Sequence, residues 1–220
     1  MEVEIWSDIA CPWCFIGKRR FEAALARFAH RDEVNVIWRS FELDPEAPAE
    51  RAGDLASRLA EKYGITVEQA HANQEHLSDL AAAEHLEFRF DLVRSGSTFD
   101  AHRVVHLAER HGLQDAMKER MLRAYFSEGQ LLGDRATLGR LAAEVGLDGE
   151  QVTGMLASGL YAEEVRTDER TAQALGISAV PTFVVDRALG VSGAQSPDAL
   201  LELLDSGWGR RTGPAVTASA

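Results

Sequence analysis

The sequence predicts an α/β protein whose small mixed sheet is interrupted by an inserted all-helical domain. Strand and helix patterns follow the order β-α-β near the N-terminus and β-β-α near the C-terminus. Between these halves, residues from about 54 to 176 show helical periodicity almost throughout. When this stretch is set aside, the remaining elements form one small sheet with flanking helices. We therefore expect one domain that is split in sequence around a second.

The first half begins with a strand pattern over residues 2–9, where apolar and polar residues alternate. Residues 12–30 follow as a helix, with Pro12 in the first position, where its missing N–H costs nothing. Three apolar side chains share one face of this helix, namely Phe21, Leu25 and Phe28. Residues 33–41 show a second strand pattern. This order predicts a parallel strand pair joined by a right-handed crossover.

The second half carries two short strand patterns, over residues 180–186 and 189–193, which we expect to form a hairpin. Ser196 then caps a last helix that begins at Pro197. A Pro- and Glu-rich stretch after residue 41 indicates a domain boundary. The predicted division is 1–44 for the first half of the sheet domain, 45–158 for the inserted helical domain, 159–208 for the second half and 209–220 for a flexible tail.

Composition and charge are those of a soluble globular protein. Hydrophobic residues make up 45% and charged residues 26% of the 220 residues. The net charge of −12 is spread along the chain without a basic patch, so we expect no nucleic-acid partner. No apolar stretch approaches the roughly 20 residues of a membrane span. The start, MEVEIWSDIA, lacks the pattern of a secretory signal, so we expect a cytoplasmic protein with no membrane contact.

Both cysteines of the chain, Cys11 and Cys14, lie in one CPWC motif at the predicted junction of strand and helix. A sulfur at a helix N-terminus meets free backbone N–H groups and the positive end of the helix dipole, which favour a thiolate. A thiolate is the attacking species in thiol–disulfide exchange. Helical phase places Cys14 on the face of Phe21, so we expect Cys14 to be buried and Cys11 to lie at the exposed tip. One thiol is then placed to attack and the other to resolve.

Basic residues follow the motif, but we expect them to have little effect on Cys11. Lys18 is seven residues further along the predicted helix, which is a distance of about 10 Å. That distance is about one Debye length, so the interaction through solvent is small. The helix N-terminus is therefore the better candidate for stabilising a thiolate.

Two other interpretations of the cysteine pair are a metal site and a structural disulfide. A structural zinc site needs four ligands, and the chain has no second CxxC. His102 and His106 lie at i, i+4 spacing in HRVVH, but Arg stands where a zinc protease carries Glu. A disulfide that closes a four-residue loop would restrain little of the unfolded chain. We therefore favour redox chemistry and expect no metal.

A second signal is SAVPTFVV, in which Val180 and Pro181 precede the late strand. A cis bond between them would turn the backbone of Val180, so that an extended peptide or thiol ligand could pair with it beside the cysteines. A trans proline that starts a strand is the other interpretation. The sequence alone leaves both open.

Taken together, these motifs resemble a known family. The segments that carry the resemblance are DIACPWCFIGKRRFE, STFDAHRVVHLAERHG, and AVPTFVVD followed by VSGAQSPDAL. They look like the DsbA-like thioredoxin-fold oxidoreductases, in particular the FrnE-type branch, over residues 2–205. The resemblance implies a thioredoxin fold interrupted by a helical domain that overhangs the active site. It also implies Cys11 as nucleophile, Cys14 as resolving thiol and Pro181 as a cis proline that faces them.

The same superfamily contains kappa-class glutathione transferases and 2-hydroxychromene-2-carboxylate isomerases. These proteins usually carry serine at the position that matches Cys11, so the presence of both cysteines favours disulfide chemistry here. The better-known periplasmic members are exported and carry His within the CxxC dipeptide, where this chain has Trp13. Its oxidising strength is therefore not transferable from them.

Four further residues are candidates for the site. The resemblance places His102 toward the cleft, where it could hydrogen-bond a substrate, and an ordinary half-buried histidine is the alternative. Asp8 could relay a proton from Cys14 or form the turn at the strand end. Gln195 precedes the last helix, whose N-terminus could hold a carboxylate such as that of glutathione, and a plain turn is the alternative. Trp13 could stack on a substrate or pack under the helical domain.

We expect a thiol–disulfide oxidoreductase that cycles Cys11 and Cys14 between dithiol and disulfide. Its partners would be protein or small-molecule thiols and disulfides. The alternative is a glutathione-dependent transferase or isomerase acting on a small molecule, and a third hypothesis is a redox-inert binding or chaperone-like protein. No cofactor is expected beyond glutathione as a candidate co-substrate. The natural substrate, the redox direction and the oligomeric state stay open.

Overall fold

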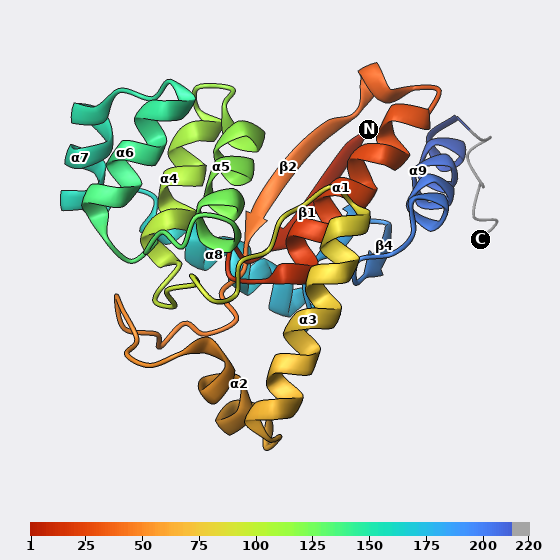
Figure 1. The fold of residues 1–220 in the computed structure, drawn as a ribbon. Coiled ribbons are helices and arrows are strands. Elements are labelled where there is room, and N and C mark those ends of the chain that lie inside the picture. The colour runs from red at the N-terminus through yellow and green to blue at the C-terminus, as the bar shows by residue number, and fades with distance from the viewer. Residues whose placement is uncertain (213–220) are drawn as a thin grey trace.

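The computed structural model describes residues 1–212 and contains a four-stranded mixed sheet (Figure 1). The strands are β1 (Glu2–Ser7), β2 (Asn35–Ser40), β3 (Thr182–Val185) and β4 (Leu189–Ser192), and they lie in the order β2-β1-β3-β4. β1 and β2 are parallel, with Val3 opposite Val36. β3 runs antiparallel to β1 and to β4. The predicted parallel pair and the predicted hairpin are confirmed.

Helices cover both faces of the sheet, and every residue of β1 after Glu2 is therefore buried. The flanking helices are α1 (Pro12–Arg27), α8 (Ala162–Ala174) and α9 (Pro197–Thr212). α1 and α9 pack together on one face, where the ring of Phe21 stacks 5.5 Å from that of Phe183. α8 lies on the other face, where the Trp6 indole N–H donates to the carbonyl of Asp168 at 3.0 Å.

The inserted helices form two groups (Figure 1). They are α2 (Leu55–Tyr63), α3 (Val67–Ala83), α4 (Phe99–Glu109), α5 (Gln114–Phe126), α6 (Arg135–Val145) and α7 (Gly149–Ala157). α4 to α7 pack on one another, with α5 against edge strand β2. α2 and α3 form a hairpin that projects away from the sheet. A capping box of Thr66 and Gln69 begins α3, as its sequence predicts.

The expectation of nearly continuous helix between residues 54 and 176 is wrong over one segment. Residues 84–98 are irregular. Leu86 and Phe88 are buried there, and the partly buried Phe90 packs on the same core. The ring of Phe88 stacks 4.8 Å from that of Phe126. Apolar residues at every second position suit an extended chain that packs one side on a core. This alternation explains why the segment is extended although the segments before and after it are helical.

The predicted element ends also shift. β1 ends at Ser7, α1 ends at Arg27, and β2 is limited to residues 35–40. α9 continues to Thr212, so residues 209–212 are helical and do not belong to a flexible tail. The basic residues near its end suit the negative pole of the helix dipole. The rest of the predicted tail, residues 213–220, lies outside the described residues.

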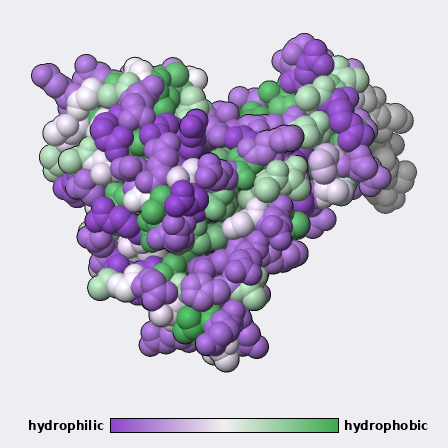
Figure 2. Space-filling model, in the orientation of Figure 1, coloured by the Kyte–Doolittle hydropathy of each residue, from purple (hydrophilic) through white to green (hydrophobic). Residues whose placement is uncertain are grey.

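Polar residues cover most of the molecular face that Figure 2 presents, with apolar residues in smaller patches. None of the helices within residues 1–212 is long and apolar enough to cross a membrane. The apolar side chains gather instead in a main core that joins the sheet to helices α4 to α7.

Candidate functional site

The two cysteines lie at the first turn of α1, directly after β1. Cys11 is the N-cap residue with an extended backbone, and Pro12 follows in the first turn. The backbone N–H of Cys14 donates to the carbonyl of Cys11 at 3.0 Å. Both thiols are free. The structure therefore places two thiols one helical turn apart at a helix N-terminus, as the motif predicts.

The burial of the two thiols departs from the prediction in one respect. Cys14 is fully buried at 0% exposure, which confirms the helical-phase argument. Cys11 is only 4% exposed, so its predicted position at an exposed tip is wrong. The reason is tertiary: both cysteines lie in a buried cluster with Val180, and Phe41 and Ile177 pack on this cluster from segments distant in sequence. We call this group the cysteine cluster; its members are Trp6, Cys11, Cys14, Ala172, Val180 and Val184, with Phe41 and Ile177 packed on them.

The Val180–Pro181 peptide bond is cis and lies beside the cysteines. The Sγ of Cys11 donates to the carbonyl oxygen of Val180 at 3.5 Å. On its other side, Pro181 packs on α1 at Gly17. A Cβ atom added at Gly17 would lie 2.8 Å from Cγ of Pro181, a distance shorter than any normal contact. Gly17 was not among the predicted site residues, although a glycine within an otherwise good helix is a signal of close approach.

The surroundings of Cys11 favour the protonated thiol. The hydrogen bond with the Cys14 thiol, and then burial, raise the pKa of Cys11 well above its ordinary value. The Asp8 carboxylate acts in the same direction. The backbone N–H of Cys14 opposes them, and this is the helix N-terminal effect predicted from the sequence. In this structure the Cys14 hydrogen bond, burial and the Asp8 carboxylate outweigh the lowering effect of the Cys14 N–H on the Cys11 pKa.

Asp8 forms the turn that carries the chain from β1 into the motif. Its carboxylate accepts hydrogen bonds from the backbone N–H groups of Ala10, at 3.2 Å, and Leu43, at 2.8 Å. Burial acts to raise the pKa of Asp8, but the hydrogen bond with His102 and the N–H of Leu43 outweigh it, and the net shift is downward. The turn-forming interpretation is supported by these contacts.

His102 is brought into the site and is buried there. Its Nε2 lies 3.4 Å from Oδ1 of Asp8, and the residue is only 1% exposed. Burial lowers the pKa of His102, so the ring is neutral at pH 7, although the contact with Asp8 acts against this shift. The expectation of a half-buried histidine is therefore wrong, because α4 packs His102 onto the end of β1, while its role in binding a substrate stays a prediction.

Lys118 is a charged residue of the site that was not predicted from the sequence. It is only 1% exposed, and its Nζ donates to the carbonyl of Ser7 at 3.0 Å. Burial lowers its pKa to about 8, against the opposing charges of Cys14, Asp8 and Cys11. A signal was present in the sequence. Lys118 occupies a position within the apolar stripe of α5, next to Met117 and one turn before the buried Met121 and Leu122.

Two predicted substrate-binding residues lie at the surface. Trp13 is 40% exposed, next to the N-terminus of α1. Gln195 is partly buried, and its side-chain amide donates to the carbonyl of Ser192 at 2.7 Å. The hydroxyl of Ser196 accepts from the N–H of Ala199 at 3.2 Å, as the predicted cap of α9 requires. The contacts of Gln195 therefore serve the turn between β4 and α9.

The histidines of HRVVH contact different partners and do not converge on one point. Nε2 of His106 lies 3.1 Å from both the Asp168 carboxylate and the Ser40 hydroxyl, whereas His102 contacts Asp8. Within residues 1–212, no group of three or more His, Cys, Asp or Glu side chains is placed to hold a metal ion.

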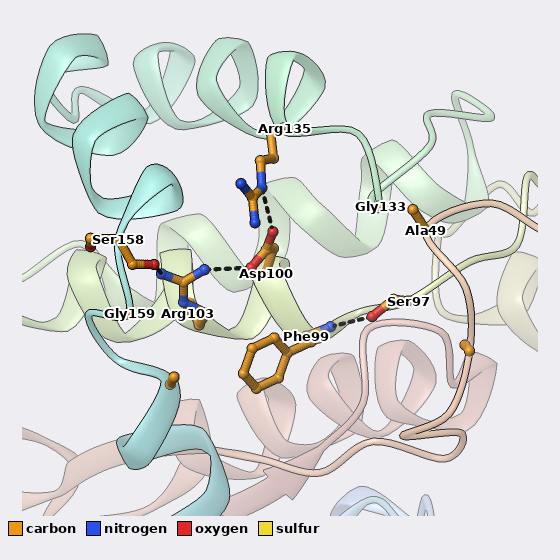
Figure 3. Close-up of a pocket in the computed structure, with 11 residues that line it drawn as sticks. Ala49, Ser97, Phe99, Asp100, Arg103, Gly133, Arg135, Ser158 and Gly159 are labelled. Carbon is orange, nitrogen blue, oxygen red and sulfur yellow. Dashed lines mark hydrogen bonds and ion pairs between the residues drawn. The ribbon is translucent and has the colours of Figure 1, made fainter.

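A separate cavity of about 450 Å³ lies among the inserted helices (Figure 3). Arg103 and Arg135 both point to the carboxylate of Asp100 on its wall. Arg103 also donates to the carbonyls of Met155, Ser158 and Leu160. Its guanidinium therefore ties α4 to α7 and to the segment that follows. None of the lining residues belongs to the cysteine cluster.

Comparison with known proteins gives concordant results. A family model described as the DSBA-like thioredoxin domain matches residues 2–205. The crystal structure of probable DsbA oxidoreductase SCO1869 from Streptomyces coelicolor is 48% identical, with a TM-score of 0.93, and the match covers 97% of this chain and 92% of that one. The uncharacterized protein YwbO from Bacillus subtilis (strain 168) is 28% identical over 210 residues, which is 90% of this chain and 92% of YwbO.

More distant structures share the fold. The cytosolic disulfide reductase DsbM from Pseudomonas aeruginosa has a TM-score of 0.67 at 22% identity, with 94% of this chain and 98% of DsbM covered. At that identity the likeness shows the fold alone. The α/β thioredoxin-like fold with a mixed four-stranded sheet and an inserted helical region, expected from the sequence, is thus confirmed.

Proposed function

The chain belongs to the DSBA-like thioredoxin domain family, and from this membership and the geometry of the site we propose that it is a thiol–disulfide oxidoreductase. In this proposal Cys11 and Cys14 cycle between dithiol and disulfide, with Cys11 as the nucleophile. Within the family we propose the FrnE-type branch, supported by CPWC together with AVPTFVV. The observation that carries the proposal is a pair of free thiols at the N-terminus of α1 with the Val180–Pro181 bond beside them.

The burial of the two thiols supports the assignment of their roles. Cys14 is fully buried, whereas Cys11 retains 4% exposure, so Cys11 is the sulfur that a substrate disulfide can reach with the smaller rearrangement. Attack by the Cys11 thiolate would form a mixed disulfide and release one substrate thiolate. Cys14 would then attack Cys11 Sγ, release the second substrate thiolate and leave the Cys11–Cys14 disulfide.

The neighbourhood of Cys11 supports recognition through backbone contacts. The Val180 carbonyl accepts a hydrogen bond from the Cys11 thiol. Once this thiol reacts, an extended substrate segment could form hydrogen bonds with the same Val180 backbone. Trp13 and Leu43 are exposed apolar side chains, at 40% and 44%, and both lie near the motif. Leu43 is held there because its N–H donates to Asp8. Apolar contacts of this kind would add affinity without strong sequence preference.

Catalysed reduction of insulin by dithiothreitol tests the proposal. We expect the wild-type chain to accelerate the reaction and the Cys11→Ser variant to lose that acceleration. The Cys14→Ser variant should instead accumulate a mixed disulfide, visible by mass spectrometry, because Cys11 can attack but nothing resolves the product. Wild-type activity no greater than that of Cys11→Ser would rule out the proposed reaction.

The same variants separate the proposal from the glutathione-dependent alternative. A transferase or isomerase needs one thiol to bind and activate glutathione or its substrate, so its turnover would survive the loss of Cys14. A disulfide-exchange enzyme loses catalytic turnover with either cysteine. Retained turnover of a small molecule by Cys14→Ser would therefore favour the alternative.

The proposal extends to partners and compartment. We propose protein and small-molecule thiols and disulfides as partners, with glutathione among the small molecules, and a cytoplasmic location. A cytoplasmic dithiol pair would be kept largely reduced by the thiol pool. Thiol trapping in rapidly acidified cells checks this point: the pair should be isolated mainly as the dithiol.

A further inference from the structure

Lys118 is unusual because it is a buried cation without a carboxylate bound to it. Lys18 provides the comparison within the same molecule. Lys18 is 2% exposed and forms ion pairs with Glu22, Asp115 and Glu119. Lys118 is 1% exposed, yet among residues 1–212 no Asp or Glu oxygen lies within the 4.0 Å of an ion pair. A buried cation without such a partner carries a large desolvation cost.

The position of Lys118 is fixed by two contacts. Its Nζ donates to the carbonyl of Ser7, the last residue of β1, at 3.0 Å. The ring of Trp38 lies 5.7 Å from Nζ. An ammonium has three N–H donors, and Ser7 supplies the one hydrogen-bond acceptor found within the described chain. The other donors remain available at the point where β1 passes into the turn that leads to Cys11.

The charges that face Lys118 come from three elements. Asp8 directly follows Ser7, whose carbonyl accepts from Lys118, and Cys11 and Cys14 come next in the chain, at the start of α1. The ionised forms of all three favour the protonated amine. Lys18, from α1, opposes them. His102, from α4, is neutral because burial lowers its pKa. Lys118 is therefore the cation that stands opposite the thiols, while Asp8 contributes a negative charge to the same site.

We propose that the ammonium of Lys118, which the inserted helical region supplies through α5, stabilises the thiolate of Cys14 by its charge during disulfide exchange. This inference rests on the proposed function. It assigns to the inserted region a direct part in the chemistry of the cysteine pair.

The step balances in both directions. From a mixed disulfide between Cys11 and substrate, the Cys14 thiol loses its proton to solvent, and the Lys118 ammonium stabilises the thiolate that remains. The Cys14 thiolate attacks Cys11 Sγ, the Cys11–Cys14 bond forms, and the substrate leaves as a thiolate that takes a proton from solvent. The cysteine pair is oxidised by two electrons and the substrate disulfide is reduced. In the reverse direction, Cys14 leaves as a thiolate, which the Lys118 ammonium stabilises until it takes a proton from solvent.

The test compares Lys118→Met with Lys18→Met. Both substitutions remove a buried ammonium beside Trp38, since Lys18 Nζ lies 5.8 Å from the same ring. The readouts are the pH titration of thiolate absorbance in the reduced protein and the rate at which a preformed Cys11 mixed disulfide is resolved. We expect Lys118→Met to raise the thiolate titration midpoint by about one pH unit or more. Its resolution step should slow about tenfold or more near neutral pH.

The control separates electrostatics from stability. Lys18→Met should leave the thiolate midpoint unchanged even though it loses ion pairs. Lys118→Met should unfold at a temperature no lower than wild type, because methionine removes the desolvation cost of the ammonium. An unchanged midpoint in Lys118→Met, or an equal shift in Lys18→Met, overturns the proposal.

A second measurement uses the unmutated protein and does not depend on the variant folding. The ¹³Cε shift of Lys118 is titrated in the dithiol and disulfide forms. By linkage, a thiolate that Lys118 stabilises must in turn raise the pKa of Lys118, so this pKa should be lower in the disulfide form. Equal pKa values in the two forms overturn the proposal. Both readouts work without a protein substrate, so an inactive wild type in the insulin assay would count against the proposed function alone.

Discussion

At the residue scale, the site depends on how closely Pro181 approaches α1. Pro181 is buried between the cysteine cluster and Gly17. The absence of a side chain at Gly17 lets the proline ring contact the helix, one turn beyond Cys14. This contact holds the carbonyl of Val180 at 3.5 Å from Cys11 Sγ. The helix therefore carries a glycine in a position where alanine would favour helix formation.

We expect Gly17→Ala to destabilise the protein by about 1–3 kcal/mol, the usual cost of overpacking. The added Cβ would lie 2.8 Å from the Pro181 ring, and a proline ring cannot rotate away from it. The exchange rate in the insulin assay should fall with the stability, because Val180 moves with Pro181. Urea denaturation of the reduced protein measures the change.

Gly139→Ala is the matched control for this variant. Gly139 lies within α6, and an added Cβ there would meet no atom within 4 Å. Removing a helical glycine in open space should stabilise the protein by about 0.5–1 kcal/mol. Equal stability changes in the two variants would contradict the packing argument for Gly17.

At the element scale, α8 is joined to the end of β2 by charged groups. Asp168 accepts from the N–H of Ser40 at 2.8 Å and contacts His106. Two residues before Asp168, the guanidinium of Arg166 donates to both Glu42, at 2.5 Å, and Glu169, at 2.7 Å. Each of these two carboxylates keeps one buried oxygen without a hydrogen-bond partner in the described chain. One guanidinium thus pairs with the buried Glu42 and the partly buried Glu169, which favours a shared proton.

Stability should consequently depend on pH through Glu42. Burial raises the pKa of Glu42 from 4.5 to about 7, with Arg166 opposing and Glu169 adding to the shift. Because the folded-state pKa lies above the unfolded one, this stabilisation is complete below pH 4.5 and is lost as the pH rises through 7. The loss is on the order of 2 kcal/mol.

Glu42→Gln should remove this dependence, because the amide stays neutral at every pH. Relative to wild type, the variant should gain stability between pH 4.5 and 7. Urea denaturation at both ends of this range measures the difference. The exposed Glu61→Gln variant on α2 serves as the control. Parallel stability profiles for Glu42→Gln and wild type would show that Glu42 does not carry the excess proton.

At the scale of the whole molecule, the inserted region and the sheet domain share one hydrophobic core and one group of ion pairs between α1 and α5, which we call the charged seam. The core runs from β1 and α1 to helices α4 to α7. The seam joins α1 to α5 through Lys18, with Asp115 and Glu119, and through Arg19, with Glu119. The inserted region is therefore held against the site on two sides, and Lys118 projects from the same helix as the seam.

Lys18→Met should lower the free energy of unfolding by about 2–3 kcal/mol, toward the lower end of the cost of breaking a buried ion pair. The reason is that three carboxylates lose a shared cation, and two of them, Glu22 and Asp115, are 42% and 62% exposed and so partly compensated by water. Thermal unfolding in low salt measures the effect. A variant as stable as wild type would show that the seam does not hold α5 to α1.

The sequence by itself determined the order of elements, the parallel β1–β2 pair, the hairpin and the burial of Cys14. These features follow from local periodicity and from chain connectivity, which act over a few residues or a single crossover. The motif also placed both thiols at the start of a helix, since Pro12 suits the first helical turn.

Only the tertiary structure decided what surrounds the thiols. Asp8 and His102 are 94 residues apart, and Lys118 and Ser7 are 111 apart. Helical periodicity shows which face of α4 or α5 is buried, but not which strand end it packs against. The burial of Cys11 has the same origin, because Val180 contacts its sulfur and Phe41 and Ile177 pack on the cluster that contains it, all from other segments. Helical phase therefore assigned a face to each cysteine, while long-range packing determined the charge and the solvent exposure at that face.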